Sequence, residues 1–358
     1  MRPRSSIVAL LFAVTAGLAA GRAAAGPGPD EVAAARTALA TYDDVVRAQK
    51  VRSGANVTLQ LDDPCPEVLS TPKAAPLSHA IDTLTRLVSR EPGHPQARIV
   101  LAQALERMGH FGPAVEQLEA HVKLHPGDAA AWNSLGVALS RRGGKGSLER
   151  KLECYRQSTK LETTNPAAWA NLCNALTMAG RPGEAISAGL RATRLKPQYV
   201  YAWMNLGVAY GMKGDAEQEE KAYLAAIQVP ATEEKCPFAR FNLGLCYERR
   251  KQYPQAIAWY RDALRVGLPQ GPRSREAALF RHSLARVLYQ NGDYTEATFE
   301  AAEAIQIAPN LPEPYSLLGH LLEQAGDKAA SRRMFVKATQ LLEKFGPSHP
   351  ERVTRHAE

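Results

Sequence analysis

Apolar residues recur along most of the chain at the spacing of amphipathic helices. Leu172 and Leu176 are one helical turn apart, and Ile186 and Leu190 repeat that step a few residues later. The run Gly-Arg-Pro-Gly at 180–183 separates the two apolar stripes. Glycine and proline interrupt helices, so the pattern predicts two helices joined by a tight turn.

A similar sequence motif recurs at regular intervals along the chain. Trp132, Trp169 and Trp203 lie in AAAWNSLGVAL, PAAWANLCNAL and VYAWMNLGVAY, and successive tryptophans are 37 and 34 residues apart. One complete copy has its key positions at Pro166, Trp169, Leu172, Leu176, Gly180, Ala185, Ala192 and Pro197. A single helical hairpin leaves one face uncovered, so we expect each copy to bury that face against the next copy.

This order of a bulky residue, Leu-Gly, an aromatic residue, a glycine turn, alanines and proline resembles the tetratricopeptide repeat. The resemblance implies an all-α, right-handed solenoid of helix-turn-helix units. We divide residues 95–345 into seven units: 95–128, 129–165, 166–199, 200–236, 237–277, 278–311 and 312–345. Residues 77–94 match only the second half of a unit, and 346–358 are interpreted as a C-terminal tail.

Residues 26–76 depart from the repeat. We interpret them as an N-terminal cap with a helix from Asp30 to Lys50 and an irregular remainder. Within the units, small residues such as Gly207 and Ala185 are expected to let the two helices approach closely. Large residues such as Tyr223 would fill the space between them.

The first 25 residues have the features of an export signal. Arg2 and Arg4 precede an apolar run at 7–20, and three alanines at 23–25 follow. The run is shorter than a membrane-spanning helix, so we expect cleavage after the last of these alanines and a periplasmic or secreted protein without a membrane span. An uncleaved anchor is the alternative.

Composition narrows the range of functions. The chain of 358 residues has 45% apolar and 22% charged residues, which is typical of a folded soluble protein. Its net charge of +8 falls to +5 without residues 1–25, which contain three arginines and no acidic residue. Basic and aromatic residues do not cluster together, so nucleic-acid binding is not expected.

The sequence lacks the motifs of common catalytic and cofactor sites. It has no phosphate-binding loop, nucleophile elbow or His-Glu-x-x-His sequence, so we expect neither enzymatic activity nor a cofactor. His121 and His125 are one helical turn apart but have no evident third ligand, so no metal is expected. The cysteines are odd in number, and we interpret them as structural thiols whose pairing the sequence leaves open: Cys65, Cys154, Cys173, Cys236 and Cys246.

The binding surface is expected on the first helices of the units, which line the concave wall of tetratricopeptide solenoids. Asn171, Asn205 and Asn242 precede the Leu-Gly step in three consecutive units, and Ser134 and Ser283 flank them. This run resembles the asparagine ladder of superhelical arrays in the family. A carboxamide both donates and accepts hydrogen bonds, so it can pair with an extended peptide. The alternative is that these amides bond a neighbouring helix or face water.

Around this ladder the predicted wall is apolar, while the first unit is more polar, with Gln103, Glu106 and Arg107. The candidate contacts are Asn174, Tyr201, Met204, Val208, Met212, Phe238, Phe241 and Leu245. An apolar patch with a polar rim is typical of a docking site, although the same side chains could pack between helices.

We therefore predict a non-enzymatic scaffold that binds an extended segment of another protein. The alternatives are a self-assembling structural protein and an accessory subunit of a cell-envelope enzyme.

Overall fold

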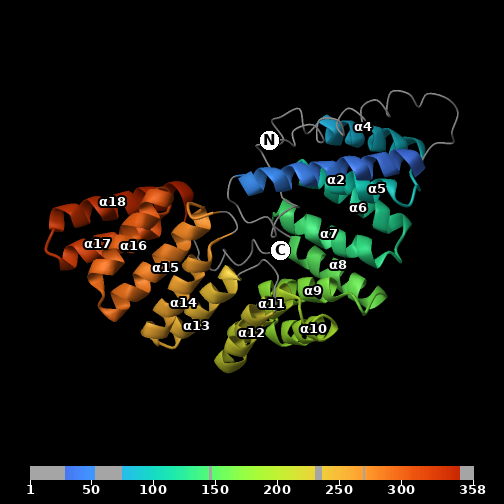
Figure 1. Cartoon of the computed structure of the whole chain (residues 1–358). Helices are drawn as coiled ribbons and strands as arrows, with labels where there is room; N and C mark the ends of the chain where they lie inside the picture. The colour runs from blue at the N-terminus through green and yellow to red at the C-terminus, as the bar shows by residue number, and fades with distance from the viewer. Residues whose placement is uncertain (1–28, 53–74, 145–146, 230–235, 269–270, 347–358) are drawn as a thin grey trace, which may run out of the picture.

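The computed structural model describes residues 29–52, 75–144, 147–229, 236–268 and 271–346, and all secondary structure in these ranges is α-helical. The helices follow one another as antiparallel pairs along an arc from α2 to α18 (Figure 1). Their bounds are α2 Pro29–Arg52, α4 Ala75–Arg90, α5 Ala97–Arg107, α6 Phe111–Leu124, α7 Ala129–Arg142, α8 Ser147–Leu161, α9 Pro166–Met178, α10 Pro182–Leu195, α11 Val200–Lys213, α12 Ala216–Gln228, α13 Pro237–Arg249, α14 Tyr253–Val266, α15 Arg275–Asn291, α16 Tyr294–Ile307, α17 Pro312–Gln324 and α18 Lys328–Phe345. The predicted export signal, Cys65 and the tail after 346 lie outside the described residues.

Each unit consists of a first helix and a second helix that pack against each other, and the second helix also packs against the first helix of the next unit. The all-α solenoid predicted from the repeat is therefore confirmed. Helices α7, α9, α11, α13 and α17 begin at the first residues of the corresponding predicted units. Helix α15 begins earlier, at Arg275, because the Ser274 hydroxyl caps it by accepting from the Ala277 N–H at 3.1 Å.

The N-terminal segment extends the solenoid. The helix expected from residue 30 to residue 50 spans Pro29–Arg52 as α2, and it packs against α4 and α5. Tyr42 of α2 and Leu84 of α4 are both almost fully buried. Helix α2 is thus the first helix that the isolated half repeat at 77–94 needs. The sequence did not indicate this pairing, because residues 53–74 separate the two helices.

A turn with left-handed backbone conformation joins the helices of most units. Gly180 and Gly214 adopt positive φ there, as do the glycines at the equivalent turns of three other units. In the fifth unit the same place is taken by Lys251, with φ of 58°. A side chain in this conformation costs about 1–2 kcal/mol, so the repeat imposes its turn geometry even where the residue is unfavourable.

A glycine in the first helix faces an aromatic ring in the second helix of four units. A Cβ atom on Gly207 would lie 2.5 Å from Cε1 of Tyr223, and Gly244 has the same relation to Tyr260. The remaining pairs are Gly136 with Tyr155 and Gly319 with Phe335. Both Tyr223 and Tyr260 are buried. The absent side chain is therefore what lets the ring fill the space between the helices.

The third unit exchanges the sizes of the two partners. Cys173 stands where those four units have glycine, and Gly189 stands where they have the aromatic ring. A Cβ atom on Gly189 would lie 3.1 Å from the Cys173 sulfur and 3.0 Å from Cδ1 of Leu206. A larger first residue is thus matched by a smaller second one.

Three repeated tryptophans tie the first helices α7, α9 and α11 to the loops before them. The indole Nε1 of Trp203 donates to the Pro197 carbonyl at 2.8 Å, and Trp132 and Trp169 make the same bond to the residue six positions earlier at 2.9 Å. In the seventh unit the Tyr315 hydroxyl donates to the Pro309 carbonyl at 3.2 Å. The tryptophan rings are partly buried against the core, so they both pack and fix the entry of the chain into the helix.

Substituting Gly207→Ala is expected to destabilise the fold by about 1–3 kcal/mol, because the new methyl group would overlap the ring of Tyr223. Urea unfolding followed by circular dichroism measures the difference. The matched control is Gly183→Ala in α10, where a Cβ atom would meet nothing within 4 Å. That change should leave stability unchanged or raise it by up to about 1 kcal/mol. Equal effects at both positions would show that the glycine–aromatic contact does not set the helix spacing.

Candidate functional site

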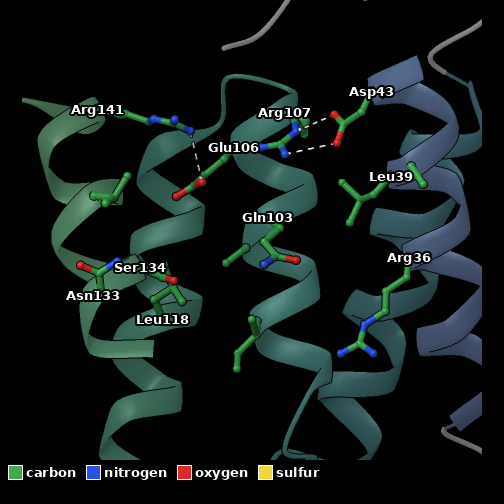
Figure 2. A pocket seen from close by; sticks show the side chains of 14 residues that line it. Arg36, Leu39, Asp43, Gln103, Glu106, Arg107, Leu118, Asn133, Ser134 and Arg141 are labelled. Atoms are coloured by element: carbon green, nitrogen blue, oxygen red, sulfur yellow. Dashed lines mark hydrogen bonds and ion pairs between the residues drawn. The ribbon is translucent and has the colours of Figure 1, made fainter. Parts of the chain in front are cut away.

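A cavity of about 530 Å³ lies at the N-terminal end of the wall formed by the first helices of the units. Figure 2 shows its side chains coming from α2, α5 and α7, with Leu118 added by α6. The lining consists of Arg36, Leu39, Ala40, Asp43, Ile99, Ala102, Gln103, Glu106, Arg107, Leu118, Asn133, Ser134, Val137 and Arg141. Its volume is in the range of ordinary ligand pockets.

Two ion pairs lie together at one end of this cavity (Figure 2). Arg107 donates to both carboxylate oxygens of Asp43, at 2.8 and 3.3 Å, and thereby joins α5 to α2. Arg141 donates to Glu106 at 3.4 Å and joins α7 to α5. The four side chains are only 12–22% exposed. The pairs therefore fix the relative position of the three helices that form the site.

Amide side chains continue from the cavity along the wall. Asn133 lines the cavity and accepts a hydrogen bond from Nδ2 of Asn171 at 3.1 Å. Nδ2 of Asn205 donates to the backbone carbonyl of Ala170 at 3.0 Å. All three amides are partly exposed, on α7, α9 and α11. We call Asn133, Asn171 and Asn205 the asparagine row.

The predicted ladder is wrong at its C-terminal end. Asn242 is 3% exposed and Ser283 is fully buried, so neither side chain faces a groove. Phe241 is also fully buried, because its ring stacks on Phe280 at a centroid distance of 4.0 Å and packs against Tyr260 at 5.2 Å. Aromatic packing between α13 and α15 thus buries Phe241, which the sequence analysis placed on the wall.

The other predicted contacts are divided between core and surface. Met204 and Phe238 are buried, and Phe238 packs edge-on against Phe280. Five residues are at least partly exposed: Ser134, Asn174, Tyr201, Val208 and Leu245. Met212 is 52% exposed at the end of α11. Of all these residues, the structure places Ser134 in the cavity.

Sequence reasoning missed the part of the site that α2 supplies. Arg36 and Asp43 belong to a segment that showed no repeat signal, and Asp43 meets Arg107 across 64 positions of sequence. Gln103, Glu106 and Arg107 were recognised as a polar stretch of the first unit, but nothing local indicated that they line a cavity. Predicting these cavity residues would have required knowing that α2 packs against α4 and α5.

Comparisons with known proteins agree with the architecture. Sequence profiles described as "Tetratricopeptide repeat" match residues 77–137, 174–234 and 238–310, which together make up more than half of the chain. The chain is a tetratricopeptide repeat protein. The sequence prediction of this family is confirmed.

Relatives of this tetratricopeptide repeat protein are distant. It is 22% identical over 231 residues to the human cell division cycle protein 16 homolog. The matched region covers 61% of this chain and 36% of that protein. The chain thus spans about a third of the length of this curated relative. It is 30% identical over 119 residues to the inactive TPR repeat-containing thioredoxin TTL3 of Arabidopsis thaliana, covering 33% of this chain and 17% of that one.

Solved structures show the same fold at low identity. The Cut9–Hcn1 hetero-tetramer of the APC/C matches with a TM-score of 0.55 and 13% identity, covering 77% of this chain and 54% of that chain. Yeast Tom70 matches with a TM-score of 0.54 and 15% identity, covering 82% of this chain and 60% of that chain.

The described cysteines and two of the histidines, His121 and His282, are buried in the core. Cys154, Cys173, Cys236 and Cys246 are buried, and no disulfide joins any two of these four thiols. Burial raises the pKa of Cys173 to about 12, so its thiol stays protonated. The Nε2 atom of His121 lies 3.0 Å from Oδ2 of Asp128, and no group of three possible metal ligands occurs in the described ranges. None of the described helices has the length and apolarity of a membrane span.

His282 on α15 is buried, with 6% of its surface exposed. Burial, with a smaller contribution from the positive charge of Arg286, lowers its pKa to about 3. The folded protein therefore keeps this imidazole neutral at pH values where an unfolded chain, with a pKa near 6.5, would protonate it.

This difference predicts that stability falls as the pH is lowered from about 6.5 towards 3, because only the unfolded state takes up the proton in that window. The contribution of His282 is at most about 1.4 kcal/mol per pH unit. Urea unfolding of the wild type and His282→Gln between pH 7 and 4.5 should give a flatter dependence for the variant. Exposed His79 is the control, and His79→Gln should leave the slope unchanged. A parallel shift of the His282→Gln curve, with the same slope, would contradict the prediction.

Proposed function

We propose that this tetratricopeptide repeat protein is a non-enzymatic scaffold that binds an extended segment of a partner protein along the asparagine row and the adjoining cavity. The observation that carries the proposal is the hydrogen bond between Asn171 and Asn133, because it joins the row to the cavity in one continuous polar surface. The site lies closer to the N-terminus than the stretch Asn171–Asn242 that the sequence indicated.

The chemistry of the row suits a peptide backbone. An asparagine amide has two N–H donors and an acceptor oxygen. Asn171 and Asn205 each use one donor inside the protein. Each therefore retains a donor and an acceptor that match the carbonyl and N–H of an extended peptide. The internal bonds also hold the amides in place, which lowers the entropy lost on binding.

The magnitudes favour a moderate affinity. Each new hydrogen bond contributes about 0.5–1.5 kcal/mol, and each buried apolar side chain about 1.5–3 kcal/mol. Association itself costs about 4–15 kcal/mol, so a Kd in the micromolar range is expected. Partner binding is also supported by the relative Cut9, whose solved structure is a hetero-tetramer with Hcn1.

The non-enzymatic part of the proposal is supported by the character of the site. Its charged groups are engaged in ion pairs between helices, as in Asp43–Arg107 and Glu106–Arg141. The most strongly shifted titratable groups, such as His282 and Cys173, are buried in the core away from the cavity lining. We find no nucleophile beside a general base among the residues that line the cavity.

Export remains part of the proposal and is supported by residues 1–25 alone. If they act as a cleaved signal, mass spectrometry of the protein purified from its native source will give a mature N-terminus at Gly26. A mature chain that retains Met1 and the apolar run would point to the uncleaved anchor instead.

The double substitution of Asn171→Ala and Asn205→Ala tests the binding surface. A random library of 12-residue peptides selects binders of the wild type, and fluorescence anisotropy then measures their affinity for each variant. We expect a loss of about 10- to 100-fold, because the two amides supply several hydrogen bonds to the peptide backbone.

The control is Asn291→Ala, an exposed asparagine at the end of α15. It should leave the affinity unchanged, and circular dichroism should show that all variants remain folded. Undiminished affinity of the folded double variant would rule out the asparagine row as the binding surface.

A further inference from the structure

We propose that the cavity between α2, α5 and α7 binds the side-chain carboxylate of one acidic residue in the partner segment, and that Arg36 holds it. This inference rests on the proposed function, because it assigns a chemical class of residue to the segment that lies on the asparagine row. The observations behind it are the charges of the cavity lining, the uncharged donors of the same lining and the position of Asn133.

The cavity lining contains three arginines and two carboxylates. Arg107 is engaged by Asp43 and Arg141 by Glu106. Arg36 makes no hydrogen bond or ion pair with another described residue, and its side chain is exposed to solvent. In Figure 2 it lies away from the end where the two ion pairs meet. The excess positive charge of the cavity is therefore located at Arg36.

Two uncharged donors accompany this guanidinium. The Gln103 amide on α5 and the Ser134 hydroxyl on α7 both line the cavity, and neither forms a hydrogen bond with another described residue. A carboxylate has two oxygens and accepts about four hydrogen bonds. Arg36 supplies the charged donor, and Gln103, which lies between Arg36 and Ser134 in Figure 2, offers the neutral donor on the neighbouring helix.

The size of the excess charge favours a carboxylate over other anions. A single charge on the ligand balances the lining, whereas a doubly charged phosphate would face the carboxylates of Asp43 and Glu106 without a second free cation. A basic side chain would be repelled by Arg36. Leu39, Ile99 and Val137 provide apolar contacts for the methylene groups of an aspartate or glutamate.

The position of the cavity links the carboxylate to an extended peptide. Asn133 belongs both to the cavity lining and to the asparagine row. A peptide that runs along Asn205 and Asn171 to Asn133 and continues towards α2 therefore crosses the cavity and brings one of its side chains to Arg36 (Figure 2). Because the peptide continues along the row, we assign the carboxylate to a side chain within the segment.

A double-mutant cycle tests the assignment. The probes are 12-residue peptides selected from a random library on the full-length protein, with the N-terminus acetylated and the C-terminus amidated. We expect the wild type to select an Asp or Glu at one fixed position. Arg36→Gln should weaken binding of such a peptide about 5- to 20-fold, and replacing the acidic residue by its amide should weaken binding to the wild type by a similar factor.

The affinity of the doubly changed pair should be little lower than that of either singly changed pair, because both changes remove the same contact. The control is Arg191→Gln, an exposed arginine on the second helix α10, which should show no coupling to the acidic residue. Raising the salt concentration should weaken the binding of the acidic peptide more than the binding of its amide counterpart.

The outcomes separate the two proposals. Peptides that depend on Asn171 and Asn205 but show additive effects of Arg36→Gln and the acid-to-amide change would overturn the carboxylate assignment alone. Binding that requires a free C-terminus, and is lost in the amidated peptides, would overturn the assignment to a side chain. If no peptide binds the wild type in a manner sensitive to Asn171 and Asn205, the proposed function fails and this inference with it.

Discussion

The close approach of the two helices within each unit is the constraint on which the rest of the structure depends. Where the first helix has glycine, as at Gly207, the ring of Tyr223 fits directly against its backbone. The third unit reaches the same spacing with Cys173 and Gly189 exchanged in size. A fixed spacing within each pair determines where the second helix meets the next first helix. The wall of first helices, with the asparagine row and the cavity, follows from this packing.

Much of the fold could be predicted because its signals are local. Glycine turns, prolines at helix starts and the i, i+4 apolar steps act within a few residues, and α9 begins at Pro166 as the spacing indicates. The sequence also predicted helix α2, but it did not indicate that this helix pairs with α4 as the first helix of a unit. Its pairing with α4 depends on burial of side chains such as Tyr42 against residues far along the chain. No local rule connects them across residues 53–74.

The candidate site shows the same limit more clearly. Asn171, Asn205 and Asn242 occupy equivalent positions of consecutive units, yet Asn171 and Asn205 are partly exposed and Asn242 is buried. In the same helix, Phe241 is also buried, because Phe280 of α15 stacks on its ring. Position within a repeat predicts the direction of a side chain from its own helix. It does not predict whether a large residue of a neighbouring unit covers it.

In the proposed binding mode, the ion pairs at the N-terminal end contribute more to specificity than to stability. Partly buried pairs such as Asp43–Arg107 recover little net free energy, because desolvation offsets most of the attraction. Their geometry nevertheless holds α2 against α5 and neutralises one arginine of the cavity, as Glu106 does for Arg141. What remains is a single cation, Arg36, on a surface whose other groups are satisfied or neutral. A scaffold with moderate affinity gains selectivity from such an arrangement, because a basic or apolar residue at this point would leave Arg36 repelled or desolvated without a partner.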